Sequence, residues 1–588
     1  MENLIKKSIV DYSKSRHNII LSEDTILIQR TKKEIPGDFT VNVFPLLKYI
    51  KINPELLAYE LADYLAENID NVYQCDVIKG FLNIHFKSEF WVKYLVDFNK
   101  SIFLPPAENK KNIMIEFSSP NTNKPLHLGH IRNNLLGDSI SRILKAVGHK
   151  VIKVNLVNDR GIHICKSMLA WKKWGKNQTP ESTGLKGDKL AGNFYVKFET
   201  ENQKEAQILQ GEIEKNKQNT ALFREAQDML IKWEEGDRQT ILLWKKMNNW
   251  VYKGFEQTYK KLGITFDKTY YESDTYKSGK NLVTEGLKKG IFFKQTDGAV
   301  CVDLKDVNLD EKVLLRSDGT SVYITQDLGT AHQRFSEFNI DEHIYVVGNE
   351  QIYHFQVLKA VLKKLDFDWA EKINHLSYGM VELPDGKMKS REGKVVDADD
   401  LIDEMIYCAQ ETTKALGKLE DYTEAEKKRN HEIIALGALK YFILKVDPKR
   451  NMMFNPEESI DFNGNTGPFI QYTYARIRSI LRKADKEKVS SQLKSLELNI
   501  NQIEIELIKN LSAYNNVLLE SSEKLSPSLI ANYTYSLAKE FNQYYHEHPI
   551  LKESDENIRS FRLLLSLLIS EILKYSMNLL GIEMPEKM

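Results

Sequence analysis

Cysteine is scarce in this sequence, and the four cysteines lie far apart. Cys75, Cys165, Cys301 and Cys408 form no C-x-x-C pair of the kind that binds zinc or carries redox chemistry. Sparse, scattered thiols are typical of proteins in a reducing cytosol. We therefore expect a cytoplasmic protein without a structural metal.

Long apolar runs are also lacking. The first residues, MENLIKKSIVDYSK, are charged throughout and contain no apolar signal-peptide core. The most apolar stretch is Phe561–Leu573 (FRLLLSLLISEIL), which is too short and too interrupted to span a bilayer. We interpret it as a buried helix and expect no membrane partner.

Net charge is absent, because 82 Lys and Arg residues balance 82 Asp and Glu residues. This balance excludes a protein coated in positive charge, but a local basic stripe for nucleic acid remains compatible with it. The 15 prolines and 29 glycines are too few for a disordered or fibrous chain. At ~100–200 residues per domain, the 588 residues suggest roughly three to five structural units.

The first hundred residues predict a small α+β unit. Residues 54–68 (PELLAYELADYLAEN) place Leu57, Leu61 and Leu65 at helical spacing, and residues 77–86 (VIKGFLNIHF) alternate around a glycine as a strand does. Pro105 and Pro106, followed by a polar run, then indicate a linker.

The next segment predicts the opening of a doubly wound α/β domain. Residues 113–117 form a short apolar strand, residues 128–147 an amphipathic helix ended by Gly148, and residues 151–157 a second strand. Residues 200–260 read as a helical insertion between the halves of the sheet. Strands are expected again at 299–304 and 344–347. From about 401 the chain looks almost wholly helical, with helix-period runs at 470–481 and 529–545.

The sequence His127-Leu128-Gly129-His130 lies where the first strand's loop becomes the helix. A helix N-terminus offers free N–H groups and a positive dipole end to a phosphate. Gly129 has no side chain, so a flat ring can lie on the backbone, and His127 and His130 can both donate to one triphosphate. Two surface histidines at a helix start are the plainer interpretation.

Residues 116–138 (EFSSPNTNKPLHLGHIRNNLLGD) closely resemble the signature of arginyl-tRNA synthetases, in which residues 127–130 fill the place of the class I HIGH motif. Three small nucleotidyltransferase groups share the H-x-G-H pattern but are far shorter than this chain. The resemblance implies a Rossmann-type catalytic domain that makes an aminoacyl adenylate from ATP. It also implies catalytic roles for His127, His130 and Lys124.

Residues 386–393 (GKMKSREG) are similar to the KMSK loop of the same class. A cationic, glycine-flanked loop can neutralise pyrophosphate as it leaves. Lys387 matches the first lysine of the pattern, but Ser390 stands in the place of the second. Lys124 or Arg391 could substitute for it. The resemblance thus predicts Lys387 as catalytic, and it predicts the ATP-binding residues Pro120, Leu128, Gly129, His130, Met388, Lys389, Ser390 and Arg391.

A bound arginine requires carboxylates, because its guanidinium has five donors and no acceptor. The resemblance predicts the arginine-binding residues Glu116, Ser118, Asn121, His130, Tyr323, Asp327 and Gln351. Tyr323 and Asp327 share a face if their segment is helical. We assign Asp327 to the guanidinium and Glu116 to a substrate amine, although the two could be exchanged, and each acid taken alone would be read as a surface residue.

The two ends of the chain resemble the tRNA-binding parts of this family. The N-terminal unit resembles its additional domain, which touches the tRNA elbow, and the C-terminal helices resemble its anticodon-binding domain. Tyr472, Arg476, Tyr545 and Met588 are the candidate tRNA contacts. A helical bundle with aromatic core positions is the alternative, and both hold in part because Tyr472 and Tyr474 cannot share a helix face.

The resemblance covers essentially the whole chain and predicts three domains. These are an N-terminal domain (1–106), a catalytic domain (107–455) with a helical insertion at about 185–270, and an all-α anticodon-binding domain (456–588). The implied activity is that of an arginine–tRNA ligase. Its implied partners are ATP, L-arginine and tRNA(Arg), with Mg²⁺ accompanying the ATP. The resemblance further implies that activation needs bound tRNA, and we expect a monomer. Two alternatives remain: a class I synthetase for another amino acid, and a catalytically dead paralogue that binds RNA or acts as a scaffold.

Overall fold

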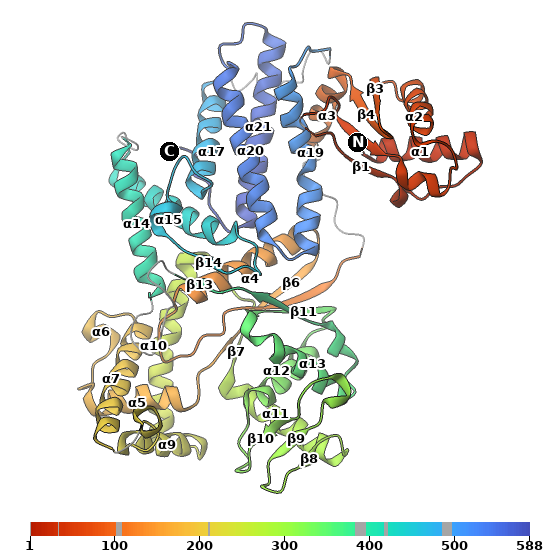
Figure 1. Ribbon diagram of the computed structural model, residues 1–588. Coiled ribbons are helices and arrows are strands. Elements are labelled where there is room, and N and C mark those ends of the chain that lie inside the picture. The colour runs from red at the N-terminus through yellow and green to blue at the C-terminus, as the bar shows by residue number, and fades with distance from the viewer. Residues whose placement is uncertain are drawn as a thin grey trace. The chain divides into compact units, whose positions relative to one another are not determined.

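The computed structural model describes residues 2–32, 34–100, 109–209, 212–382, 396–416, 422–484 and 497–588 (Figure 1). This described chain divides into two compact units. The first comprises Met1–Phe103, Ile480–Ala513 and Glu540–Ile569, and the second comprises Leu104–Ser479, Tyr514–Lys539 and Ser570–Met588. The KMSK-like loop at 386–393 lies outside the described residues.

The first unit contains a four-stranded antiparallel sheet in the order β1-β2-β4-β3. Its N-terminal elements are α1 (Glu2–His17), β1 (Leu27–Arg30), β2 (Phe39–Asn42), α2 (Pro54–Asn68), β3 (Val72–Ile78), β4 (Phe81–Phe86) and α3 (Ser88–Lys100). The predicted helix at 54–68 is confirmed. The single strand expected at 77–86 is wrong: the chain reverses at Lys79 and Gly80, both with positive φ, so that β3 and β4 form a hairpin.

The second unit is built on a five-stranded parallel sheet in the order β12-β11-β5-β6-β7. Its strands are β5 (Asn112–Glu116), β6 (Lys150–Val157), β7 (Lys268–Tyr271), β11 (Glu342–Gly348) and β12 (Ile373–Tyr378). Strand β5 neighbours both β6 and β11, so the strand order reverses there. In such doubly wound sheets ligands bind at the carboxyl ends of the strands beside this reversal. The Rossmann-type fold class is confirmed.

Helix α4 (Leu128–Ala146) begins at that reversal and is buried on nearly all sides. This differs from the amphipathic helix expected from sequence. The physical reason is that its polar residues have partners: Ser139 donates to the carbonyl of Leu579 at 2.9 Å, and Asp138 pairs with Arg142 at 2.6 Å and with Lys153 at 3.1 Å. The end of the chain therefore covers the side of α4 that would otherwise face solvent.

Helices lie between the neighbouring strands β6 and β7, and they include the region at 200–260 that was expected to be helical. These helices are α5 (Ile162–Trp174), α6 (Pro180–Thr183), α7 (Gly187–Ile208), α8 (Ile213–Asn216), α9 (Ala221–Glu234) and α10 (Arg238–Leu262). An apolar core joins α5, α7, α9 and α10.

Beyond β7 the chain forms α11 (Glu272–Lys288), β8 (Phe293–Lys294), β9 (Val300–Val302), β10 (Lys312–Leu315), α12 (Tyr323–Glu337) and α13 (Ile352–Lys364). The strand expected at 299–304 is present as β9, but it belongs to a separate antiparallel sheet, β10-β9-β8, and does not extend the main sheet.

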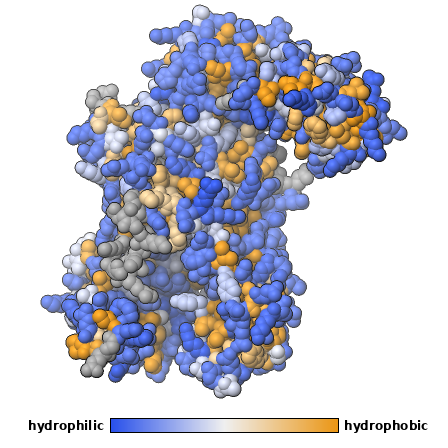
Figure 2. All heavy atoms as spheres, in the orientation of Figure 1, coloured by the Kyte–Doolittle hydropathy of each residue, from blue (hydrophilic) through white to orange (hydrophobic). Residues whose placement is uncertain are grey.

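The remaining elements are almost all helical. They are β13 (Val381–Glu382), α14 (Ala398–Ala415), α15 (Glu424–Leu444), β14 (Met452–Met453), α16 (Pro456–Ser459), α17 (Gly467–Lys483), α19 (Gln502–Glu523), α20 (Pro527–Glu547) and α21 (Glu556–Leu579). The apolar stretch at 561–573 lies in α21, and most of its side chains are buried as predicted. No helix among the described residues is long and apolar enough to cross a membrane, and the face seen in Figure 2 is mostly hydrophilic.

Gly137 lets α4 lie directly against the end of β5. A Cβ atom at this position would come within 2.2 Å of the Phe117 ring. We expect Gly137→Ala to lower stability by about 1–3 kcal/mol through overpacking, in spite of the better helix propensity of alanine. Thermal unfolding with Lys145→Ala as an exposed control on the same helix checks this. An unchanged or raised melting temperature for Gly137→Ala would contradict the close packing.

Candidate functional site

The two histidines of the H-x-G-H motif cap the start of α4 reciprocally. His127 is the N-cap, and its Nδ1 accepts the Gly129 N–H at 3.1 Å, while Nδ1 of His130 accepts the His127 N–H at 3.2 Å. The two ring centroids lie 3.9 Å apart. Because each Nδ1 accepts a hydrogen bond, each neutral ring carries its hydrogen on Nε2. Among the described residues neither Nε2–H group has a hydrogen-bond partner, so both can donate to a ligand.

The surroundings keep both rings neutral. Burial, and to a smaller extent the nearby charge of Lys124, lower the pKa of His127 to about 3. Burial, then His127 and Lys124, hold the pKa of His130 well below its usual value. Both rings can therefore offer a ligand hydrogen-bond donation beside a helix N-terminus, but no full positive charge.

A cavity of about 470 Å³ opens beside these rings. Its walls come from the start of α4, the end of β11 and the segment from β12 to β13, and they include Ser119, His127, Gly129, His130, Gly348 and Tyr378. This is the carboxyl edge of the sheet at the reversal of strand order, the place where such sheets bind ligands. A helix N-terminus, two Nε2 donors and an unobstructed glycine backbone suit the phosphates and base of a nucleotide.

The other predicted nucleotide-binding residues are distributed differently. Leu128 and Pro120 are buried and do not line this cavity. Lys124 lines a second cavity of about 240 Å³ on the other side of Leu126 and His127. Lys387, Met388, Lys389, Ser390 and Arg391 lie outside the described residues.

Asn133 joins the turn after β5 to β11 beneath the cavity, and sequence reasoning missed it. Its Oδ1 accepts the Ser118 N–H at 2.6 Å, and its Nδ2 donates to the carbonyl of Val346 at 2.7 Å. Ser118 adopts a left-handed conformation (φ 64°), which is costly for a non-glycine residue, and shares a hydrogen bond of 2.7 Å with the Tyr259 hydroxyl. The strained turn after β5 is thus held from two sides.

Glu116 is buried at the end of β5 and forms an ion pair with the fully buried Arg334 of α12. The other carboxylate oxygen accepts the Ser119 hydroxyl at 3.2 Å. The Arg334 guanidinium lies 4.7 Å from the Tyr270 ring centroid. Burial alone would lower the pKa of Arg334, but the charge of Glu116 raises it overall. Both oxygens of this predicted arginine-binding carboxylate are therefore already hydrogen-bonded within the chain, one to Arg334 and the other, at longer range, to Ser119.

Asp327 is more open. Its segment is helical, as the shared face with Tyr323 requires, and Nε2 of His354 lies 2.6 Å from its Oδ2. The side chain of Asp327 is 33% exposed, and Tyr323, one turn earlier in α12, is 77% exposed. The charges of Glu116 and Asp327 both act to raise the pKa of the buried Tyr345. His354 is a further candidate site residue, and it lies three positions after Gln351 in the sequence.

Asn121 and Gln351 occupy exposed loop positions. The loop of Asn121 is fixed to the end of β6, because Asn158 donates its N–H to the Pro120 carbonyl at 2.9 Å and accepts the Thr122 N–H at 3.1 Å. Gln351 ends a short 3-10 turn and occupies the N-cap position of α13, the helix that carries His354, without a side-chain capping bond. Both positions lie after carboxyl ends of strands, at the edge of the sheet that holds the cavity.

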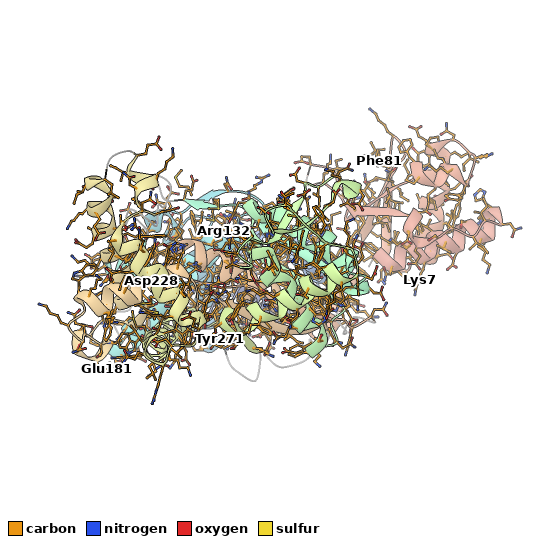
Figure 3. All side chains as sticks on the ribbon, turned by 90° about the horizontal axis from the view of Figure 1, so that it is seen from below. Lys7, Phe81, Arg132, Glu181, Asp228 and Tyr271 are labelled. Carbon is orange, nitrogen blue, oxygen red and sulfur yellow. The ribbon has the colours of Figure 1, made fainter. Side chains whose placement is uncertain are left out.

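Arg132 was also missed, and it lies in the interior of the second unit, while Glu181 lies at its edge (Figure 3). The Arg132 guanidinium donates to the carbonyls of Met380 at 2.9 Å, Pro448 at 3.2 Å and Arg450 at 2.7 Å. It thereby attaches the segment before β13, which forms one wall of the cavity, to α4. The sequence signal that could have identified Arg132 was a charged residue within the helix sequence HIRNNLLGD, beside the motif.

Three family models match the chain in succession. Residues 1–86 match the arginyl tRNA synthetase N terminal domain, residues 94–455 match the class I (R) tRNA synthetase catalytic domain, and residues 470–588 match the DALR anticodon binding domain. The chain is 52% identical to the arginine–tRNA ligase of Parabacteroides distasonis over 596 residues, which cover 100% of both proteins. It belongs to the class I arginyl-tRNA synthetases.

Other comparisons agree with this family. The arginine–tRNA ligase of Flavobacterium psychrophilum is 52% identical over 585 residues, 97% of each chain. The arginyl-tRNA synthetase of Thermus thermophilus has a TM-score of 0.78 at 26% identity, with 100% of both chains covered. The Plasmodium falciparum arginyl-tRNA synthetase shares the fold, with a TM-score of 0.74 at 22% identity over 100% of this chain and 98% of the other.

The protein is thus an arginine–tRNA ligase, and the expected ligase activity is confirmed. The reaction of its family uses ATP, arginine and tRNA(Arg). The domain boundaries at 106 and 455 stay predictions, as do the roles of the individual site residues.

The candidate tRNA contacts of this synthetase fall on helical surfaces of both units. Tyr472 and Arg476 lie together on α17, with the guanidinium 4.8 Å from the ring centroid, and both are partly exposed. Tyr474 is fully buried and bonds Glu586, which confirms that it faces away from Tyr472. Tyr545, on α20, stacks on Phe541, and Met588 is partly exposed at the end of the described chain.

The low pKa of His127 makes folding pH-dependent. The unfolded imidazole binds a proton near pH 6.5 and the folded one near 3, so the unfolded state binds more protons between these values. Stability should fall as pH drops below about 6.5, by up to about 2 kcal/mol at pH 5 for this residue. Melting temperatures of wild type and His127→Asn, which can still cap α4, should therefore converge toward pH 5. A constant difference from pH 8 to pH 5 would contradict a neutral, buried His127.

Proposed function

We propose that the cavity beside His127 and His130 binds ATP, and that the enzyme makes arginyl-adenylate there before it transfers the arginyl group to the 2′-hydroxyl of the terminal adenosine of tRNA(Arg). The observation that supports this most is the pair of free Nε2–H donors at the start of α4, beside a cavity at the reversal of strand order. We also propose that the enzyme is cytoplasmic and monomeric. Its activation step, in this proposal, needs bound tRNA.

In this reaction the arginine carboxylate attacks the α-phosphorus of ATP, and pyrophosphate leaves. His127 and His130 donate to the phosphates, and Lys124 and Lys387 supply positive charge against the leaving group. Positioning and electrostatics supply the catalysis without a covalent enzyme intermediate. Among the described residues no group of three or more His, Cys, Asp or Glu could hold a metal ion, so a Mg²⁺ ion would be held chiefly by the ATP phosphates.

Two acids form the proposed arginine pocket. Glu116 already pairs with Arg334, whereas Asp327 is partly exposed and faces His354. We therefore assign Asp327 to the guanidinium of the substrate, with His354 orienting the carboxylate. Glu116, through the oxygen that accepts only a weak bond from Ser119, is assigned to the substrate ammonium. Tyr323, Asn121, Ser118 and Gln351 complete the pocket in this proposal.

Arginine-dependent exchange of labelled pyrophosphate into ATP, run with and without tRNA, tests the proposal. Exchange that needs both arginine and tRNA supports the complete scheme. Exchange without tRNA would support formation of the adenylate but contradict its dependence on bound tRNA. Absence of exchange under all conditions, with tRNA still bound, would contradict the proposal and favour an RNA-binding role. Lysine and canavanine in place of arginine test the pocket.

Replacement of His130 removes one proposed phosphate donor and one helix cap. We expect His130→Ala to lower the exchange rate by about 10²–10³-fold, the usual cost of one preorganised donor in an active site. His149→Ala is the matched control, since His149 precedes β6 at the opposite edge of the sheet. A wild-type rate for His130→Ala would contradict the assignment of the phosphate site.

Asp327→Asn keeps the shape of the side chain and removes its charge. We expect it to raise the KM for arginine about 10–100-fold, because a charge-assisted hydrogen bond contributes about 1.5–3 kcal/mol, and to leave the KM for ATP within about threefold. Ser336→Ala, exposed on the same helix, is the control. Equal changes in both KM values would show that Asp327 does not read the substrate side chain.

A further inference from the structure

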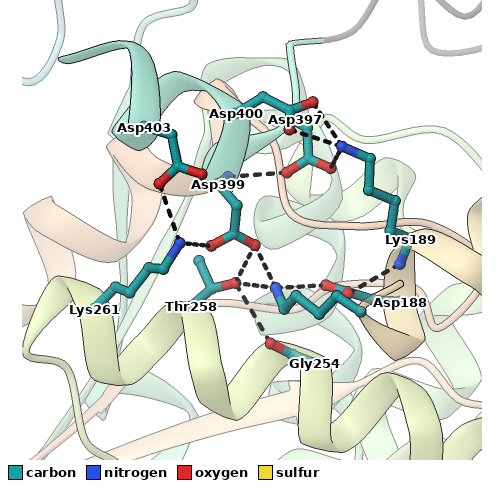
Figure 4. Close-up of polar contacts among 10 residues, drawn as sticks. Asp188, Lys189, Gly254, Thr258, Lys261, Asp397, Asp399, Asp400 and Asp403 are labelled. Carbon is teal, nitrogen blue, oxygen red and sulfur yellow. Dashed lines mark hydrogen bonds and ion pairs between the residues drawn. The ribbon is translucent and has the colours of Figure 1, made fainter. Parts of the chain in front are cut away.

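An ionic cluster lies where the helical insertion meets the segment that follows the KMSK-like loop (Figure 4). Its residues come from three helices: Lys186, Asp188 and Lys189 at the start of α7, Thr258 and Lys261 on α10, and Asp397, Asp399, Asp400 and Asp403 at the start of α14. Neither the sequence motifs nor the proposed chemistry uses any of these residues.

Lys186 is the centre of the cluster. Its ammonium forms ion pairs with Asp399 of α14 and, at 3.0 Å, with the fully buried Asp188, and it donates to the Thr258 hydroxyl. Lys261 approaches Asp399 from the other side at 3.2 Å. Gly254 makes room for this arrangement, because a Cβ there would lie 2.5 Å from Asp188. The side chains of Lys186 and Asp399 are each 16% exposed, so water screens their attraction little.

The same end of α14 is bonded to the phosphate-facing loop. The Ala398 N–H donates to the Leu126 carbonyl at 2.8 Å, and Asp397 forms a β-bridge with His127. The Asp397 carboxylate also caps α14 by accepting the Asp399 N–H at 2.9 Å. The backbone around His127 is therefore held by the first turn of α14, and Lys186 holds that turn.

Helix α7 supports the loop from its other side. A Cβ at Gly192 would lie 2.9 Å from Cδ of Pro125 and 3.5 Å from Cα of Lys124, so the helix backbone packs directly on this dipeptide. Residues 124–127 are thus enclosed between α7 and α14. The cluster around Lys186 fixes the distance between these two helices.

We propose that Lys186 is a positioning residue for the activation step, which it serves by fixing α14 against α7 and so fixing His127 and Lys124 at the ATP phosphates. This inference rests on the proposed ATP-binding role of the H-x-G-H motif. A buried ion pair is weak evidence for stability, because its desolvation offsets most of its attraction, but it is directional. A displacement of about 1 Å at a reacting group can cost about 10²-fold in rate.

Lys186→Met in the full-length enzyme removes the central charge at similar side-chain length. We expect kcat for arginine-dependent pyrophosphate exchange to fall about 10–100-fold, while the KM for arginine stays within about threefold because Glu116 and Asp327 lie on other elements. Lys197→Met is the matched control: Lys197 lies on the same helix in an exposed pair with Glu201 at 2.8 Å, and we expect no change from it.

Two further variants separate positioning from loss of fold. Lys186→Arg keeps the charge and should recover most of the lost kcat. Asp399→Asn should lower kcat like Lys186→Met, and the double variant should be no worse than the more impaired single variant, because both act through one contact. Thermal melts and circular dichroism of each variant measure the folded fraction.

A kcat within threefold of wild type for folded Lys186→Met would overturn the proposal. So would a loss of kcat that only follows the folded fraction, a parallel rise in the KM for arginine, or an equal loss in Lys197→Met. His130→Ala, assayed beside these variants, separates a failure of the proposed ATP site from a failure of the proposed role of Lys186. If His130→Ala is fully active, the ATP site itself is wrong; if it is inactive while Lys186→Met is normal, only the positioning role is wrong.

Discussion

The reciprocal capping at the start of α4 is the interaction on which the site depends. Two backbone N–H groups that a helix would leave without partners are accepted by the imidazoles of His127 and His130. The same bonds decide which ring nitrogen carries hydrogen, so one arrangement both begins the helix and leaves two Nε2–H donors on residues that line the cavity. Burial keeps these donors uncharged. A lysine or arginine in their place would bring a cation but could not accept the backbone hydrogen bonds.

The rest of the second unit holds this helix in place through polar contacts that are buried. Arg132 attaches the cavity wall before β13, Asn133 joins the turn after β5 to β11, and Asp138 bonds Lys153 of β6. Such contacts are directional, and each is costly to leave unsatisfied, so they define one orientation of α4 more sharply than apolar packing alone. The close approach of Phe117 at Gly137 adds a steric limit. Helix α4 is therefore both the core of the sheet's covering layer and the carrier of the H-x-G-H motif proposed to bind phosphate.

The two acids of the proposed arginine pocket have different partners. Glu116 and Asp327 have similar sequence signals, but the structure gives them different partners: Glu116 meets a buried guanidinium within the chain, and Asp327 meets an imidazole at a partly exposed position. A carboxylate already neutralised by Arg334 is a weaker attraction for a second guanidinium than one that faces solvent. Sequence spacing carries no information on this, because Arg334 and Glu116 are 218 residues apart.

The sequence by itself determined the local elements around the H-x-G-H motif. It also determined the family. The strand at 112–116, the helix that begins at Leu128 and the strand at 150–157 follow from short-range periodicity and from a glycine that ends the helix, and the motif residues match along the chain. Local patterns also misled in places: the residues around Gly80 form a hairpin, and 299–304 belongs to a second sheet. Only the tertiary structure decided the strand order, the burial of α4 on nearly all sides, and the partners of Glu116, Asn133 and Lys186. These depend on contacts between residues far apart in the chain, whose geometry and desolvation no local spacing encodes.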